Sequence, residues 1–191
     1  MPTLYIPVGI PAAGKDYLAQ QMVQAKLLTD DCILSPDNLR AVLTGDISNQ
    51  TVNGDVFGLI DTMIAFRNKY KQDVYLSATN LQPSKLYSIF DKLWSWDTVI
   101  IWMDTPDEVS LQRNLERERT VPEAAMQRMI QRKKSFDIKS VLDYSGGKLI
   151  DSSDMLARCY DVIFGQKAPL PFPEDTAELS ASVLGFVPAS L

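Results

Sequence analysis

The 191-residue sequence contains no histidine, which excludes Ser-His and Cys-His catalytic pairs and histidine metal sites from within the chain. Any general base must therefore be Asp, Glu, Lys or Tyr. The two cysteines, Cys32 and Cys159, lie in apolar surroundings without metal or redox spacing, so we expect buried thiols. No apolar run approaches the ~20 residues of a membrane span, and no basic-then-apolar leader is present. We expect a cytoplasmic protein without a membrane partner.

Basic charge is also scarce overall. The formal net charge is −5, which argues against a protein that coats long nucleic acid through many phosphate contacts. This charge is still compatible with binding one end of a strand. Seven of the nineteen Lys and Arg residues lie between positions 113 and 134, among several glutamates. Such a cluster is typical either of a solvated helical face or of a segment that contacts phosphate.

The most informative feature present is a glycine-rich loop between an apolar run and a helical pattern. Gly9 and Gly14 permit backbone angles at which successive N–H groups point inward at phosphate oxygens, and Lys15 can reach the β- and γ-phosphates. The following helix adds the positive end of its dipole. The alternative is a glycine-rich turn that binds no nucleotide. The residues expected to contact the nucleotide here are Gly9, Pro11, Ala12, Ala13, Gly14, Lys15 and Asp16.

Asp16 departs from the motif G-x-x-x-x-G-K-[S/T], in which a hydroxyl at this position binds Mg²⁺. A carboxylate is also a hard oxygen ligand, so we expect Asp16 to bind the metal. Its charge would otherwise repel the triphosphate, and a metal ion between them would reverse that repulsion. Alternatively, Asp16 is an acid in a first helical turn, where acids are favoured.

Apolar runs alternate with helical patterns as far as residue 164. This order predicts an α/β P-loop NTPase or kinase fold, with a mostly parallel sheet covered by helices on both faces and ligands at the carboxyl ends of the strands. We expect one domain over 1–164 and an extension over 165–191 that could dock on the domain or on a second copy. Strands are expected at 4–8, 32–34, 74–78, 98–103 and 148–150, and helices at 17–28, 36–44, about 55–71, 83–93, 106–117, 122–133 and 154–164.

An acid and a cation follow the second predicted strand. Asp37 and Arg40 share one face at the start of a helix that Ser35 caps and Pro36 opens. In phosphoryl transfer a carboxylate orients the acceptor hydroxyl and takes its proton, and a cation binds the acceptor's own anion. Asp37 and Arg40 fit these two tasks. The alternative is a surface salt bridge between neighbouring helical turns.

The segment 77–81 follows the third predicted strand, where many phosphate-loop enzymes carry an aspartate that supports the metal. This segment contains no carboxylate. Our hypothesis is that Asp16 supplies the carboxylate missing at Ala78. The neighbouring Thr79 and Asn80 are expected to contact the acceptor.

Two helices are expected to meet in a short arginine-bearing hairpin within 113–134, an arrangement typical of a closing lid. An arginine from such a lid can stabilise the charge on the transferring phosphoryl group. We expect Arg117 to have this role, with Arg113 as the second candidate. The alternative is an ordinary charged helical hairpin.

These pieces together resemble the kinase domain of phage-type 5′-polynucleotide kinases and their small P-loop kinase relatives, over roughly residues 4–164. The loop resembles the family's phosphate loop, Asp37-Asn38-Leu39-Arg40 its Asp-x-x-Arg segment, and Thr79-Asn80-Leu81 its Thr-Asn-Leu. The segment from Arg113 to Val121-Pro122 resembles the family's lid. The resemblance implies Asp37 as general base, Arg40 as a ligand of the acceptor phosphate, Arg117 as the transition-state arginine, and a role in nucleic-acid repair.

The resemblance implies ATP and Mg²⁺ as cofactors and a 5′-hydroxyl end of DNA or RNA as acceptor. The sequence lacks the Asp-x-Asp-Gly-Thr signature of the phosphatase domain that often accompanies this kinase, so we expect end phosphorylation without trimming of 3′-phosphates. Two alternatives stay open. One is a kinase of a nucleoside or other small metabolite, and the other is a non-catalytic nucleotide-binding module.

Overall fold

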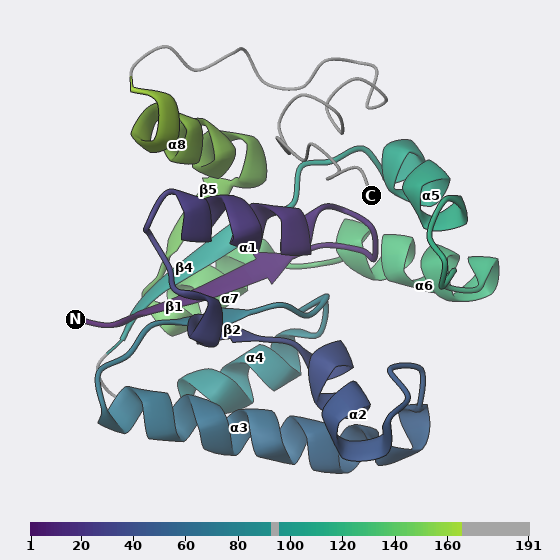
Figure 1. The fold of residues 1–191 in the computed structure, drawn as a ribbon, viewed down its shortest axis with the longest axis horizontal. Coiled ribbons are helices and arrows are strands. Elements are labelled where there is room, and N and C mark those ends of the chain that lie inside the picture. Colours follow the sequence, from purple (N-terminus) through teal and green to yellow (C-terminus); the bar gives the residue numbers. More distant parts are fainter. Residues whose placement is uncertain (93–95, 166–191) are drawn as a thin grey trace, which may run out of the picture.

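A computed structural model describes residues 1–92 and 96–165 of the chain, and its centre is a five-stranded parallel sheet (Figure 1). The strand order is β2-β3-β1-β4-β5, and every neighbouring pair is parallel. The predicted α/β architecture is therefore confirmed. The strands are β1 (Thr3–Val8), β2 (Ile33–Leu34), β3 (Val74–Leu76), β4 (Asp97–Trp102) and β5 (Lys148–Asp151).

Helices cover both faces of this sheet. Helices α1 and α8 contact each other over one face, while α3 and α4 lie on the other, with α7 against α4 (Figure 1). Parallel strands joined by helical crossovers require this two-sided cover. The helices are α1 (Lys15–Gln24), α2 (Pro36–Thr44), α3 (Asn53–Lys69), α4 (Pro83–Phe90), α5 (Asp107–Leu115), α6 (Glu123–Lys134), α7 (Ile138–Ser145) and α8 (Ser152–Phe164).

Several predicted boundaries differ from the structure by a few residues, and one helix was not predicted. Helix α1 ends at Gln24 rather than at 28, because Lys26 takes a positive φ of 56°. Strand β3 ends at Leu76 rather than at 78, so Ser77 opens the following loop. Helix α7 was not predicted; its N-terminus is capped by Asp137, whose carboxylate accepts a hydrogen bond from the Ser140 amide at 3.0 Å.

The core is built from strand residues buried on both faces of the sheet. Ile100 and Ile101 of β4, whose side chains point to opposite faces of the sheet, are both fully buried, as an interior strand of a parallel sheet requires. Cys32 and Cys159 are buried free thiols, as predicted, and burial raises the pKa of Cys159 to about 11. This core holds the ends of β1, β3 and β4 in fixed positions.

Among residues 1–92 and 96–165, no helix combines the length and apolar character needed to cross a bilayer. The extension predicted over 165–191 lies outside the described residues except for Gly165. The central strand β1 lies between β3 and β4, and the chain order of the strands reverses beside it. In such sheets ligands bind beyond the carboxyl ends of the strands at this point, which is where the glycine-rich loop begins.

Candidate active site

The loop from Gly9 to Lys15 connects β1 to α1 in a conformation that depends on its small residues. Ala12 and Gly14 have positive φ values of 61° and 89°, and Gly14 precedes the first turn of α1. The Gly9 amide donates to the Thr79 carbonyl oxygen at 3.0 Å, which ties the loop to the segment after β3. Gly9 and Gly14, the two glycines predicted to shape a phosphate nest, therefore lie beyond the carboxyl end of β1.

Gly9 is packed too closely for any side chain. A Cβ atom at this position would lie 2.6 Å from Met103 Cβ. We expect Gly9→Ala to lower the free energy of unfolding by about 1–3 kcal/mol and to weaken nucleotide binding, because the loop or Met103 must shift. Urea unfolding measures the change in stability, and nucleotide titration measures the change in affinity.

Gly58→Ala in α3 is the matched control: nothing lies within 4 Å of its new Cβ, so the substitution should be neutral or stabilising. Equal stability and affinity in both variants would contradict the close packing.

Lys15 is buried, with 9% of its surface exposed, and its ammonium donates to the carbonyl oxygens of Ile10 at 2.6 Å and Gly9 at 3.2 Å. The pKa of Lys15 is lowered to about 8, chiefly because the ammonium is buried; the carboxylates of Asp16 and Asp37 oppose the shift, and the positive charges of Arg117 and Lys133 add to it. The described residues thus hold this ammonium in the loop without a direct carboxylate partner. Bound phosphate would supply the missing negative charge.

The buried ammonium makes the stability of the nucleotide-free protein depend on pH. The pKa of Lys15 falls from 10.5 to about 8 on folding, so between these values the unfolded chain holds a proton that the folded chain has lost. Stability therefore rises with pH across this interval. Relative to Lys15→Met, we expect the wild type to gain up to about 3 kcal/mol in free energy of unfolding, measured by urea unfolding. A difference that does not change with pH would contradict the buried charge.

The side chain of Asp16, in the first turn of α1, contacts that of Ser77, which follows β3. The Ser77 hydroxyl donates to Asp16 Oδ1 at 2.5 Å; Ser77 is buried and Asp16 is exposed. Our hypothesis named Ala78 as the position that lacks the carboxylate; the residue whose side chain contacts Asp16 is its neighbour Ser77, the first residue after β3. The Tyr75 hydroxyl donates to the Lys15 carbonyl oxygen at 2.7 Å and fixes this alignment.

These oxygens have the chemistry that Mg²⁺ prefers. No group of three or more His, Cys, Asp or Glu residues gathers as a metal site in the part of the chain that the structure describes. Mg²⁺ in nucleotide sites needs only one or two carboxylates, because phosphates and waters complete its coordination. Asp16 and Ser77 therefore fit a metal bound together with a nucleotide.

Asp37 and Arg40 lie together at the start of α2, where the Ser35 side chain accepts the Asn38 amide as predicted. Arg40 Nη1 donates to Asp37 Oδ1, while its Nε and Nη2 donate to Asn53 Oδ1 at 3.0 and 2.7 Å. Arg40 is buried, with 5% of its surface exposed. In this structure Arg40 therefore holds Asp37 in place and joins α2 to the start of α3.

Arg119 is a site residue to which the sequence analysis gave no role. Its Nη1 lies 3.5 Å from Asp37 Oδ2 and donates to the Ile47 carbonyl oxygen at 3.2 Å. These contacts connect the hairpin between α5 and α6 with the start of α2 and with the segment that follows this helix. The arginine-rich composition of 113–134 was the available signal, but it could not show which arginine reaches Asp37.

Helices α5 and α6 meet in a hairpin within the segment where the sequence analysis expected one; its role as a lid stays a prediction. Buried Asn114 closes it by two 2.9 Å hydrogen bonds with the main chain of Val121. Arg113 Nη1 lies 3.9 Å from where a Cβ on Gly14 would stand, and the charge of Arg117 lowers the pKa of Lys15. The structure thus brings Arg113 beside the glycine-rich loop and places Arg117 where its charge acts on that loop.

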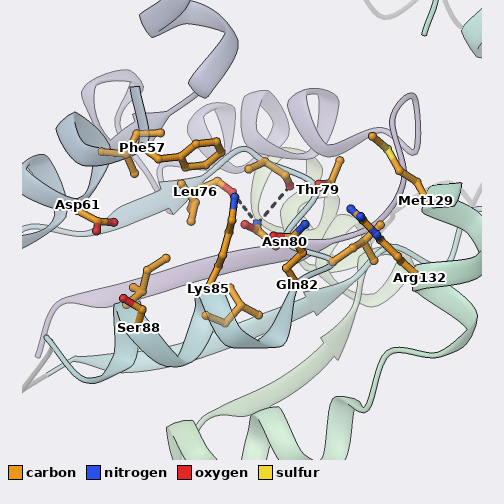
Figure 2. A pocket seen from close by; sticks show the side chains of 15 residues that line it. Phe57, Asp61, Leu76, Thr79, Asn80, Gln82, Lys85, Ser88, Met129 and Arg132 are labelled. Atoms are coloured by element: carbon orange, nitrogen blue, oxygen red, sulfur yellow. Dashed lines mark hydrogen bonds between the residues drawn. The ribbon is translucent and has the colours of Figure 1, made fainter. Parts of the chain in front are cut away.

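Thr79 and Asn80, predicted to contact the acceptor, follow β3 but differ in their surroundings. The Asn80 side-chain nitrogen donates to the carbonyl oxygen of Leu76 at 3.0 Å (Figure 2) and to that of Pro7 at 2.8 Å. Asn80 itself takes a positive φ of 53°. Its amide therefore secures the segment after β3, while Thr79 lies beside the loop and lines a pocket.

The pocket, of about 260 Å³, lies between α3 and α4, with α6 at one side (Figure 2). Its inner wall is apolar, and Lys85 and Arg132 lie at its edges, with the Lys85 ammonium 4.5 Å from the centre of the Phe57 ring. The lining residues are Phe57, Ile60, Asp61, Leu76, Ala78, Thr79, Asn80, Leu81, Gln82, Lys85, Leu86, Ser88, Ile89, Met129 and Arg132.

The family model described as AAA domain matches residues 4–136 of this chain, a span that includes the loop, Asp37 and the hairpin between α5 and α6. The chain belongs to this AAA domain family. Together with the five-stranded parallel sheet, this match establishes a P-loop kinase-like fold. No curated protein matches the sequence.

Solved structures show the same fold at low sequence identity. A chain of the Pnkp1/Rnl/Hen1 RNA repair complex matches with a TM-score of 0.59 and 19% identity over 72% of this chain and 46% of that chain. This chain thus spans less than half of the RNA repair chain. A gluconokinase from Sinorhizobium meliloti matches with a TM-score of 0.52 and 15% identity, over 86% of this chain and 91% of the gluconokinase chain. Chaetomium thermophilum Kti12 in complex with ADP-AlF3 matches with a TM-score of 0.54 and 15% identity, over 85% of this chain and 100% of the Kti12 chain.

Proposed function

We propose that this protein is an ATP-dependent kinase that transfers the γ-phosphate to the 5′-hydroxyl of a DNA or RNA end. The observation that carries the proposal is that an acid and an arginine from other parts of the fold both act on Lys15. Asp37 and Arg117, from two other elements, are near enough to the loop lysine to shift its pKa in opposite directions. An acid, a lysine in a phosphate loop and a lid arginine are the parts that phosphoryl transfer requires.

Each part has one task in the proposed reaction. The main chain from Gly9 to Gly14 and the Lys15 ammonium hold the phosphates of ATP. The acceptor oxygen attacks the γ-phosphorus and its proton passes to the Asp37 carboxylate, while the bond from that phosphorus to the β–γ bridging oxygen breaks and ADP leaves. Arg117, with Arg113 beside the loop, stabilises the charge on the equatorial oxygens.

Asp16 would hold Mg²⁺ in this site. When bound with the nucleotide, the metal neutralises charge on the β- and γ-phosphates. The carboxylate of Asp16 follows Lys15 directly, and its Oδ1 already accepts the Ser77 hydroxyl. The loop, the lysine and an oxygen ligand thus follow one another in the sequence, as the binding of a nucleotide with its metal requires.

The pocket between α3 and α4 supports a nucleic-acid acceptor. Thr79 connects it to the loop, and its apolar inner wall suits the face of a base better than a polyol, whose hydroxyls would lose hydrogen bonds to water. Its volume of about 260 Å³ is below the ~300–1,000 Å³ of pockets for drug-sized ligands, so it suits one ring system. Lys85 and Arg132 at its edges would attract the phosphate that follows the first nucleotide.

The proposal is tested by offering γ-labelled ATP with a 5′-hydroxyl DNA oligonucleotide, the matching RNA, and the same oligonucleotides already carrying a 5′-phosphate. We expect label only on the 5′-hydroxyl ends. Label on no oligonucleotide would contradict the proposal. A nucleoside and gluconate are included as acceptors, because the net charge of −5 favours the alternative of a small-metabolite kinase. Competition by long oligonucleotides would oppose that alternative.

A further inference from the structure

Asp16 and Ser77 together supply one carboxylate and one hydroxyl, the two groups of a P-loop metal site, but each group stands at the position where the other is usual. In the motif G-x-x-x-x-G-K-[S/T] the residue after the lysine supplies a hydroxyl, and the residue after a neighbouring strand supplies a carboxylate. Here the residue after Lys15 is Asp16, and the first residue after β3 is Ser77. Their side chains meet directly, with the Ser77 hydroxyl donating to Asp16 Oδ1 at 2.5 Å.

We propose that Asp16 and Ser77 have exchanged roles as a coupled pair. Asp16 is the anionic group that holds the metal, and the Ser77 hydroxyl takes the place of the loop hydroxyl. This inference rests on the proposed function only so far as the site binds a nucleotide with Mg²⁺. It makes Ser77 a positioning residue of the metal site, a role that the sequence analysis did not give it.

The exchange keeps the two kinds of oxygen group that a P-loop metal site provides, a carboxylate and a hydroxyl. The pair still contains one carboxylate and one hydroxyl, joined by one hydrogen bond, so the net charge beside the phosphates is unchanged. Ser77 has 8% of its surface exposed, whereas Asp16 is exposed. The charge thus lies on the more solvated of the two positions, which avoids the cost of burying a carboxylate.

The two single exchanges should fail for different reasons. Asp16→Ser leaves two hydroxyls in contact and no anion for the metal. Ser77→Asp puts two carboxylates within hydrogen-bond distance, so they repel each other unless one takes up a proton or a cation lies between them. The double variant, Asp16→Ser with Ser77→Asp, restores one of each group. If Asp16 were only an acid in a helical first turn, its loss would weaken the helix slightly and leave the metal untouched.

The test is a cycle of these four proteins, measured by titration with a fluorescent ADP analogue in Mg²⁺ and in EDTA, without any acceptor. In wild type we expect Mg²⁺ to tighten binding at least about tenfold, as a coupling free energy of about 1.4 kcal/mol requires. Asp16→Ser should lose this enhancement, Ser77→Asp should reduce it, and the double variant should return to within about threefold of wild type. Asp16→Asn, which keeps the shape and removes the charge, should behave as Asp16→Ser.

Two results would overturn the exchange: full Mg²⁺ enhancement in Asp16→Ser, or a double variant no better than the worse single variant although thermal unfolding shows it folded. If Ser77→Asp does not fold, Ser77→Ala serves instead, and unchanged Mg²⁺ enhancement there would contradict a role for Ser77. These readouts are independent of the acceptor. A cycle that behaves as expected in a protein that labels no 5′-hydroxyl end would therefore contradict the proposed function and support the exchange.

Discussion

Replacing Asp37 by Asn is expected to lower kcat for transfer to a 5′-hydroxyl oligonucleotide by about 10²–10⁴-fold, because the amide cannot take the proton of the acceptor hydroxyl. The Kd for ATP should change little, since Asp37 lies on the α2 side of the site and the loop holds the phosphates. Single-turnover kinetics with γ-labelled ATP measure the first quantity, and nucleotide titration measures the second.

Asp55→Asn is the matched control for this substitution, because Asp55 is an exposed acid in the first turn of the neighbouring helix α3. It should retain wild-type kcat. Asp37 also pairs with Arg40 and Arg119, so thermal unfolding of Asp37→Asn must show that α2 and the hairpin stay folded. A folded Asp37→Asn protein with wild-type kcat would exclude Asp37 as the general base.

Replacing Arg117 by Ala is expected to lower kcat about a thousandfold or more, because a lid arginine stabilises charge that develops on the transferring phosphoryl group. The effect should fall mainly on kcat rather than on the KM for ATP, since the interaction strengthens in the transition state. Steady-state kinetics over a range of ATP concentrations separate the two parameters. Arg117→Lys should recover only part of the rate, because an ammonium lacks the planar fork of the guanidinium.

Arg128→Ala serves as the control for Arg117→Ala. Arg128 is an exposed arginine of α6 in the same lid segment, so its loss changes the net charge of the lid equally. Its kcat should stay within about twofold of wild type, as expected for a surface charge that is screened by salt. Equal losses in the two variants would indicate a general charge effect of the lid and would contradict a specific role for Arg117.

The sequence predicted those parts of the site that depend on neighbouring residues. The loop, the cap at Ser35 and the salt bridge of Asp37 with Arg40, which the sequence analysis gave as the alternative for this pair, each arise within a few positions, so backbone preferences and spacing determine them. The order of strands and helices was predicted for the same reason. Periodicity and turn residues report local conformation, and the alternating order leaves few ways to build the sheet.

The contacts that the sequence could not predict join distant segments. Asn53 orients Arg40 from thirteen residues away, and Arg119 reaches Asp37 from the lid. No pattern among neighbouring residues predicts contacts between segments so far apart in the sequence. Ser77 was missed for a related reason: the apolar run suggested a strand as far as Ala78, whereas β3 ends at Leu76 and the Ser77 side chain contacts Asp16, sixty-one residues away in the sequence.

The most direct test of this account is a crystal structure with ADP, Mg²⁺ and a 5′-hydroxyl oligonucleotide. We predict the β-phosphate of ADP in the nest from Gly9 to Lys15 and the 5′-oxygen within hydrogen-bond distance of Asp37, with Arg117 facing the space between them. An oligonucleotide whose 5′-oxygen lies away from Asp37, or an ADP bound outside the loop, would contradict the account.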